Sequence, residues 1–488
     1  MVPEPERILG SPETVFWNSF RHAPSRYSCL RGRRLDFFNL TLASVLAIGP
    51  ALLSAQAVAG PEETAPGEAL SVSLDLEAGI GGFTTHGTNF GAGRVDVRSG
   101  DVTGNTSWSE GYAKPNVGAE YATGAAGTVY GGLSAVGAFT GGEGDAAGYT
   151  RSGDGRVSME TAFLGWRSGG LFSEGWGEDA VDLSYGRQEF QVGDGFLIQD
   201  GNLDQFNKGA YWLAPRRAFR QAGLVRLNTA PVRADLFYLE SDRDQDDTEL
   251  AGVNLEYRRE SLGTLGLMYF EVLDSGSPTV FGARDGMDVV SLRVNGLTLP
   301  ALPNLSLWGE YVSEGGGARD GDIDAHAWYV EGDYSLSAWP WSPTLSYRYS
   351  RFSGDPDPDD DKRRDFDPFF YGWSRGWGTW FQGEVTGEYL LFNSNQVTHM
   401  LHLSASPSEA FSGGVIAYRF DLDQDNYYGT PVSGRHFADE LNLYLDWTVN
   451  EQVSVSAAYG IAVPRTAAKE LFGDKRFQLA ELAVYVSF

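Results

Sequence analysis

Arginines are the residues of this sequence whose type and spacing most plainly suggest chemistry. The stretch KGAYWLAPRRAFRQAGLVRL (208–227) has five basic residues and no acidic one, in a chain of net charge −28. They are Lys208, Arg216, Arg217, Arg220 and Arg226. A guanidinium pairs in a fork geometry with carboxylates and phosphates. These arginines could therefore line a constriction that binds an anionic solute, or form an outer-rim patch that binds lipopolysaccharide phosphates.

Further arginines occupy polar positions of segments in which apolar and polar residues alternate. The basic residues expected to face a lumen are Arg226, Arg233, Arg258, Arg293, Arg348 and Arg419. Acidic residues expected on the same face are Asp235, Glu256, Glu310, Glu331 and Asp333. Two interpretations are open. The arginines could form a ladder that draws an anion through a pore, or the two signs could pair with each other along a water-filled lining.

The third feature is the aromatic run DPFFYGWSRGWGTWFQGE (367–384), which follows the acidic run DPDPDDDKRRDFD. An aromatic run that was simply exposed would favour aggregation. We therefore expect it to fold back into a pore mouth, with Trp373, Trp377 and Trp380 packed there. Arg375 would point towards the solute path. An equally open alternative is that the run only plugs the pore.

Catalysis and metal chemistry have weak support. His399 and His402 are three apart in an alternating segment, so they face opposite sides and cannot share a metal. No G-x-S-x-G motif is present. The DPDPDDD stretch (355–361) lacks EF-hand spacing and reads as a solvated acidic loop. The sequence therefore predicts no enzyme, no cofactor and no metal site.

These side chains must be positioned by strands, because alternation with period two recurs along the chain. In LSVSLDLEAGI (70–80), Leu70, Val72 and Leu74 fall on one face, and serine and acidic residues fall on the other. Segments of about ten alternating residues separated by turns are typical of outer-membrane β-barrels. A bilayer cannot hydrogen-bond to the backbone, so a sheet that spans it must close. The fold class expected is therefore all-β: a transmembrane antiparallel up-and-down barrel with long extracellular loops.

The number of strands follows from parity. Eighteen candidates put both chain ends at the periplasmic side, with short turns there and long loops outside. Counting 381–392 as another strand would invert the later loops, so it is assigned to a loop. The predicted strands are 69–81, 113–123, 127–140, 155–168, 179–190, 221–229, 232–241, 249–259, 263–274, 286–298, 304–314, 323–337, 343–353, 394–406, 410–421, 437–448, 453–463 and 476–488.

The N-terminal residues 1–59 are expected to be an extension plus a secretory signal peptide. Three arginines precede the apolar run FFNLTLASVLAIGPALL, and small residues follow in SAQAVAG. Cleavage would leave residues 60–488 as the barrel and a net charge near −30, which argues against nucleic acid as a partner. Cys29, the one cysteine, would be removed with the signal. The terminal Phe488 suits recognition by the barrel-assembly machinery of a Gram-negative outer membrane.

Residues 70–488 resemble the alginate export porin family. The similarity lies in YGRQEF and GDGFLIQDG (185–201), in GAYWLAPRRAFRQA (209–222), and above all in 367–384 with NSNQVTHMLHLS (393–404). The resemblance implies a monomeric barrel of 18 strands whose arginine-rich constriction passes alginate outward. By this resemblance, the arginines of the family's constriction are expected at Arg187 of the G-R-Q motif, in the basic stretch and at Arg375. Arg187, however, shares its phase with Leu183 and Tyr185, so it would face lipid unless a bulge intervenes at Gly186.

The function expected is an outer-membrane porin that passes an anionic polysaccharide, most simply alginate, out of the cell. A general or small-organic-anion porin and a non-conducting adhesin barrel are the alternatives. Arginine forks on uronate carboxylates and aromatic platforms for sugar rings would supply the specificity.

Overall fold

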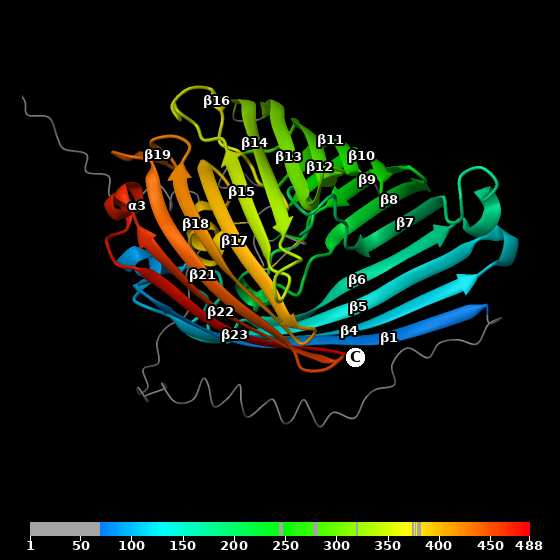
Figure 1. Ribbon diagram of the computed structural model, residues 1–488, viewed down its shortest axis with the longest axis horizontal. Helices are drawn as coiled ribbons and strands as arrows, with labels where there is room; N and C mark the ends of the chain where they lie inside the picture. The colour runs from blue at the N-terminus through cyan, green and yellow to red at the C-terminus, as the bar shows by residue number, and fades with distance from the viewer. Residues whose placement is uncertain are drawn as a thin grey trace, which may run out of the picture.

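One closed sheet forms the wall of the molecule (Figure 1). The computed structural model describes residues 69–243, 247–260, 262–276, 282–318, 321–372, 375, 377 and 382–488. The predicted signal region therefore lies outside the described residues, as do Trp373 and Trp380. Eighteen long antiparallel strands, each paired with its neighbours in chain order, surround the interior. The all-β barrel and its predicted strand number are confirmed.

The barrel strands are β1 (Leu70–His86), β4 (Ser107–Ala122), β5 (Thr128–Gly142), β6 (Gly155–Arg167), β7 (Val181–Gln188), β8 (Phe219–Thr229), β9 (Val232–Glu240), β10 (Thr248–Arg259), β11 (Gly263–Ser275), β12 (Met287–Leu299), β13 (Leu302–Ala318), β14 (Gly321–Ser335), β15 (Thr344–Phe352), β17 (Gln396–Ser408), β18 (Phe411–Leu422), β21 (His436–Thr448), β22 (Val453–Pro464) and β23 (Phe477–Ser487). β1 closes the wall by pairing with β4 on one side and with β23 on the other, from Glu77–Ser487 to His86–Gln478.

Short elements lie in the connections. They are β2 (Arg94–Val95), β3 (Val102–Thr103), β16 (Lys362–Arg363), β19 (Asn426–Tyr427), β20 (Thr430–Pro431), the 3₁₀ turns η2 (Thr88–Gly91), η3 (Gly124–Ala126), η4 (Gly169–Phe172) and η5 (Phe206–Lys208), the π-helix η6 (Gly383–Leu391) and the α-helix α3 (Thr466–Leu471). β16, β19 and α3 lie at the same end of the barrel, at the upper left of Figure 1. None of the helices in the described residues is long and apolar enough to cross a membrane.

The two ends of the barrel differ in the length of their connections. Strand pairs at one end, which we call the turn end, are joined by as few as two residues, as at 230–231, 300–301 and 409–410. The other end, the loop end, bears the two longest connections, 189–218 and 353–395. The prediction that 381–392 is not a strand is confirmed, because η6 occupies it.

The outward face of the wall is apolar, as the alternation requires. Val157 is 78% exposed and Leu164 65% exposed, whereas the neighbouring Glu160 is fully buried on the inside. Large apolar side chains at this exposure would be unfavourable in water and are favourable against lipid. The outward positions therefore form the surface expected to meet the hydrocarbon core of a bilayer.

The interior contains two apolar cores. One joins β1, β4 and β17–β23 to η6, with Phe83, Trp108 and Phe477 among its buried residues. The other joins β8–β15 to the segments around Phe196 and Phe370. Both form because the loops 189–218 and 353–395 fold into the barrel, so apolar residues on the inner wall have partners.

This filled interior corrects one predicted orientation. Arg419 was expected to face the lumen, but its side chain is 56% exposed and shares the outward face of β18 with Val415. It forms an ion pair with Asp421 at 2.8 Å. The inward positions are taken instead by Ile416, Tyr418 and Phe420, which pack in the first core. The prediction was wrong because it assumed that every inner face meets water, so it placed the apolar residues outside.

Candidate functional site

Two loops meet inside the barrel and narrow it. We call 189–218 the first inward loop and 353–395 the second. Ile198 and Phe370 form a parallel bridge between them. The backbone N–H of Gln199 donates to the carbonyl of Phe370 at 2.9 Å, and that of Gly372 donates to the carbonyl of Gly195 at 2.8 Å. The part of the aromatic run that the structure describes therefore folds back into the barrel and joins the first inward loop.

Wall carboxylates hold both loops by their backbones. One oxygen of Glu110 on β4 accepts the N–H groups of Trp212 and Leu213, each at 2.9 Å. Glu160 on β6 accepts those of Arg217 and Ala218 at 2.7 and 2.9 Å. A carboxylate that accepts two backbone bonds satisfies donors that would otherwise be buried without a partner. The lumen acids thus fix the constriction in place.

Glu440 on β21 does the same for the second inward loop. It accepts the N–H groups of Val385 and Thr386 at 3.0 and 2.7 Å, where η6 begins. These clamping roles of Glu110, Glu160 and Glu440 were missed from the sequence. The only available signal was a glutamate at an inward position of an alternating strand, and that signal does not distinguish a clamp from a lumen lining.

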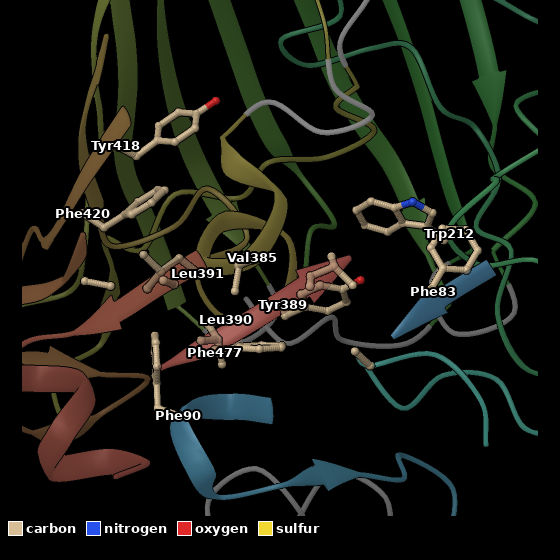
Figure 2. Close-up of a cluster of buried hydrophobic side chains, with 14 of the residues drawn as sticks. Phe83, Phe90, Trp212, Val385, Tyr389, Leu390, Leu391, Tyr418, Phe420 and Phe477 are labelled. Atoms are coloured by element: carbon tan, nitrogen blue, oxygen red, sulfur yellow. The ribbon is translucent and has the colours of Figure 1, made fainter. Parts of the chain in front are cut away.

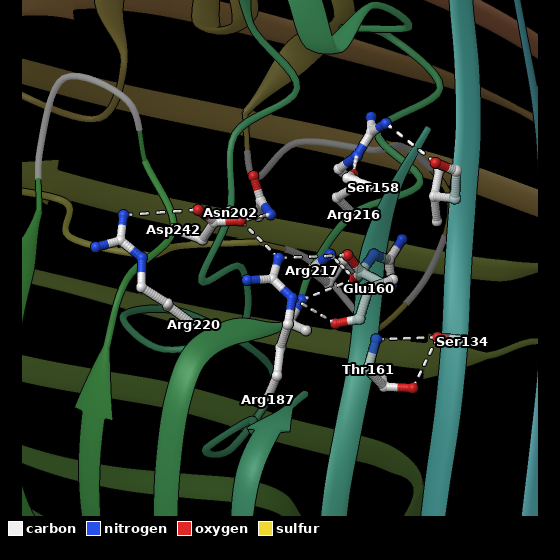
Figure 3. A network of polar contacts seen from close by, with 12 residues as sticks. Ser134, Ser158, Glu160, Thr161, Arg187, Asn202, Arg216, Arg217, Arg220 and Asp242 are labelled. Carbon is white, nitrogen blue, oxygen red and sulfur yellow. Dashed lines mark hydrogen bonds and ion pairs between the residues drawn. The ribbon is translucent and has the colours of Figure 1, made fainter. Parts of the chain in front are cut away.

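Arg187 lies in a polar network beside Glu160 (Figure 3). Gly186 has φ 133, and the pairing of β7 with β8 shifts register between Gly186 and Gln188. This is the bulge that an inward Arg187 required. Its Nε donates to the carbonyl of Glu160 at 2.8 Å, and its guanidinium pairs with Asp242 at 2.5 Å. Burial alone would raise the pKa of Asp242, but Lys208 and Arg187 lower it below the usual value.

Arg216 is buried, and its guanidinium is surrounded by protein acceptors. Only 1% of its side chain is exposed, and it forms an ion pair with the equally buried Asp204. It also donates to Ser158 Oγ at 3.0 Å and to the carbonyl of Arg156 at 3.1 Å. The geometry indicates a residue that holds the first inward loop against β5 and β6. A passing solute would not reach it.

Three other arginines face a common pocket beside the first inward loop. The cavity is about 310 Å³ and is lined by Glu189, Phe190, Gln191, Gln199, Arg217, Arg226 and Arg233. Arg217 is exposed, and among the described residues its guanidinium has no hydrogen bond or ion pair. Arg226 lies 3.5 Å from Asp182, and Arg233 lies 3.0 Å from Asp235. The pocket therefore offers an anion the guanidinium of Arg217, with two arginines that each have one acidic partner and with Glu189 also on its lining.

Arg233 had been placed on the lumen face but not among the solute-binding residues. Arg226 and Arg233 lie on the two strands of one hairpin, β8 and β9, and the pairing of these strands brings both side chains to the same part of the wall. Arg220 lies at the loop end of β8, where it pairs with Glu240, Asp242 and Asp247. The side chain of Arg220 is 39% exposed and does not line the pocket.

The remaining predicted lumen arginines are largely neutralised. Arg293 pairs with Glu256 at 2.9 Å and Arg348 with Glu331 at 2.5 Å, and both side chains are almost completely buried. Arg258 also pairs with Glu256, at 2.5 Å, but stays 48% exposed near the turn end. On this part of the wall the structure resembles the paired lining more than a continuous basic ladder.

Arg375 points towards the wall. It pairs with Glu331 at 2.8 Å and Asp333 at 3.1 Å, and it lies 3.7 Å from Asp194 of the first inward loop. Its guanidinium also lies 3.9 Å above the Trp308 ring. These contacts hold the second inward loop to β13 and β14, and they favour the plug interpretation of the aromatic run over a place on the solute path.

Trp377 packs inside the barrel, as expected, by stacking on Tyr444 with ring centroids 4.3 Å apart. His402 also contacts Tyr444, at 2.9 Å, whereas His399 contacts Tyr347 on the outward face. The two histidines therefore face opposite sides. Among the residues that the structure describes, no group of three or more histidine, cysteine or acidic side chains is arranged to hold a metal ion.

Comparison with known proteins identifies relatives in sequence and in fold. A sequence model described as "Alginate export" matches residues 143–470. No curated protein matches the chain. Among solved structures, the barrel is similar to Acinetobacter baumannii OccAB4 and OccAB2, each with a TM-score of 0.54 at 12% and 8% identity. These matches cover 85% and 86% of this chain and 98% of each relative.

Pseudomonas aeruginosa OccK2 (OpdF) is similar with a TM-score of 0.51 and 13% identity, over 86% of this chain and 97% of that one. At such identities the likeness shows the barrel fold alone. The sequence match is independent of it and covers both inward loops.

Proposed function

Because this chain belongs to the alginate export family, we propose that it is a passive porin of the Gram-negative outer membrane that passes an anionic polysaccharide of the alginate type out of the cell. The observation that carries this proposal is the pocket formed by Arg217, Arg226 and Arg233 beside the first inward loop. Guanidinium groups without full neutralisation attract uronate carboxylates and bind them in a fork geometry. No cofactor or energy source is required for such transport.

A reconstituted channel tests this function. Purified protein in a planar bilayer should conduct anions in preference to cations, and oligomers of a uronic acid should block the current. Substituting Arg217 and Arg226 together by Ala should weaken the block by about tenfold or more, since each lost charge-assisted contact contributes about 1.5–3 kcal/mol. Exchanging the outward Arg419 for Ala is the matched control, because it removes one arginine without touching the pocket. Cation selectivity without block would contradict the proposal.

A porin for small organic anions is the second candidate, and the size of the pocket favours it. A volume of about 310 Å³ is at the lower limit for small-molecule sites and suits one ring better than several. The dependence of the current block on oligomer length distinguishes the two candidate functions. A polysaccharide channel should be blocked more strongly as the oligomer lengthens, whereas a small-anion channel should respond equally to the monomer.

A further inference from the structure

The helix η6 lies inside the barrel although it belongs to a loop (Figure 2). All nine of its residues, Gly383–Leu391, are buried. It packs against β21, β22 and β23, with Leu390 and Leu391 directed into the first apolar core. A buried loop helix is uncommon, because connections normally run over the surface. It therefore fills interior space that would otherwise be open.

Both ends of η6 are attached to other parts of the chain. Glu440 accepts two N–H groups at its start, where a negative charge is favoured by the helix dipole. At its end, the hydroxyls of Tyr427 and Tyr428 donate to the carbonyls of Leu390 and Leu391, at 2.8 and 3.4 Å. These bonds attach both ends of the helix, but none of them neutralises an acidic side chain of η6.

The two acidic side chains of η6 are buried among other acids. Glu384 is 4% exposed and Glu388 1% exposed, and the Glu388 carboxyl lies near the Tyr211 hydroxyl but forms no well-aligned hydrogen bond within the described residues. Glu384 lies beside Asn442, since a Cβ built on Gly460 would be 3.6 Å from the Glu384 Cβ and 3.3 Å from Asn442 Oδ1. Asn442 is itself fully buried, and its side chain lies close to the Glu440 carboxyl.

The groups that act most strongly on these two acids are acidic or neutral, although Arg243 acts on the nearby Tyr149 and Tyr371, and Arg348 acts on Tyr418. The wall contributes Glu110 from β4, Glu440 from β21 and Glu481 from β23, and the loops contribute Asp145, Tyr149, Tyr211 and Tyr371, with Tyr389 on η6 itself. No lysine or arginine of the described residues forms an ion pair with Glu384 or Glu388.

These surroundings determine whether Glu384 and Glu388 are protonated or ionised while η6 lies inside the barrel. Burial, followed by the charge of Glu440, raises the pKa of Glu384. Burial, followed by the charge of Glu384, raises the pKa of Glu388 well above its ordinary value, although the hydroxyl of Tyr211 opposes the shift. If η6 left the interior, contact with water would lower the pKa values of both carboxyls to the ordinary range. The helix is therefore compatible with the interior only while these carboxyls are protonated.

We propose that η6 is a proton-dependent plug of the channel, seated while Glu384 and Glu388 are protonated and released from the interior when they ionise. This inference rests on the proposed porin function. Since the released state has the lower pKa values, seating takes up protons. Below the ordinary pKa of a glutamate the seated state is fully favoured, and it loses favour as the pH rises towards the raised values. Each carboxyl that titrates shifts the open-to-closed ratio by about tenfold per pH unit.

The backbone next to η6 is consistent with two positions for the helix. Phe392 has φ 52, in the left-handed region that a bulky side chain seldom adopts, and it is followed by Asn393 and Asn395 with φ values of 55 and 47, which asparagine tolerates more readily. Strain of this kind persists only while the surroundings hold it. Release of η6 would relieve it, so this short stretch is the natural hinge.

Thiol labelling tests the movement without relying on conductance. Val385→Cys places a thiol on the buried face of η6, in a chain whose only cysteine is Cys29. Glu451→Cys, in an exposed turn at the opposite end, is the reference for the pH dependence of the thiol itself. The ratio of the two maleimide labelling rates should rise by at least tenfold from about pH 5 to about pH 9. Leu391→Cys is the substitute if Val385→Cys does not fold, as judged by heat-modifiable migration.

The double variant Glu384→Gln/Glu388→Gln keeps the shape of the protonated acids and cannot ionise. It should hold the labelling ratio low and constant over the same pH range. A ratio that does not change with pH in the parent, or that rises equally in the double variant, overturns the plug. Bilayer conductance then separates the two proposals. If the conductance does not respond to pH, the porin proposal stands and the plug proposal is wrong. If labelling depends on pH but no conductance is found at any pH, the plug proposal stands and the porin proposal is wrong.

Discussion

At the scale of the residue, arginines that look alike in the sequence differ in what surrounds them. Arg216 and Arg217 are adjacent, yet the first is buried against Asp204 and the second is exposed in the pocket. One neighbour therefore holds the first inward loop, and the other leaves its guanidinium on the lining of the pocket. Counting arginines therefore overestimates the binding site, and the set of partners of each one defines it.

The first prediction concerns this pair. Arg216→Ala leaves Asp204 buried without its cation, which should cost about 3–5 kcal/mol of folding free energy. The urea midpoint of the detergent-solubilised barrel should fall clearly for Arg216→Ala. Arg217→Ala should leave that midpoint unchanged, because its side chain has no partner to lose. Equal midpoints in the two variants would contradict the structural role given to Arg216.

The second prediction concerns Arg375. Its guanidinium is 18% exposed and joins the second inward loop to Glu331 and Asp333, so Arg375→Ala should loosen that loop by about 1–3 kcal/mol. Single-channel recordings should show a larger and noisier conductance with the anion preference retained. A fall in anion selectivity without a change in conductance would instead place Arg375 on the solute path.

At the scale of the element, the strands were predictable from the sequence, whereas the fold of the two inward loops inside the barrel was not. Alternation in segments such as 70–80 predicts a strand and its outward face from local residues alone. The assignment fails where both faces are apolar, as in β18, because the inner partners of Tyr418 and Phe420 come from η6, which is distant in the sequence. The run 381–392 could be excluded as a strand by parity, but its π-helical form was not visible in the sequence.

The bulge at Gly186 gives the third prediction. With φ 133, a Cβ at this position would lie 2.4 Å from the carbonyl oxygen of Ala162. Gly186→Ala should therefore cost about 1–3 kcal/mol and disturb the orientation of Arg187. The matched control is Gly175→Ala, which has open space around it. Urea unfolding should separate the two variants, and identical curves would show that the bulge is not required.

At the scale of the whole molecule, the barrel joins an apolar exterior to an interior that is filled by two loops from the loop end. The exterior is made by many strands that each contribute exposed apolar residues, such as Leu292 at 54% and Val330 at 52%. The interior is filled by two loops that bridge to each other through Ile198 and Phe370. The wall therefore presents an apolar surface that suits lipid, and the two loops narrow the interior.

The fourth prediction tests the lipid-facing belt. Leu292→Arg, in the middle of β12, places a charge where the hydrocarbon core is expected and should cost about 2–4 kcal/mol. Folding into liposomes should be impaired for this variant. Asn304→Arg, exposed at the start of β13 near the turn end, should fold normally. Normal folding of both would mean that β12 does not face lipid there.

The sequence by itself determined the barrel, its number of strands and most of its outward face, with β18 as an exception, because each depends on a period-two pattern and on turn lengths that are local in the chain. It also indicated the family, through the motifs around the inward loops. Only the tertiary structure decided which partner each arginine has. Arg217, Arg226 and Arg233 line one pocket, whereas Arg216, Arg348 and Arg375 are held by carboxylates of the same loop, of a neighbouring strand or of the facing wall. The period-two pattern gives the side of the wall on which a residue lies, but it does not give the side chain that meets it there.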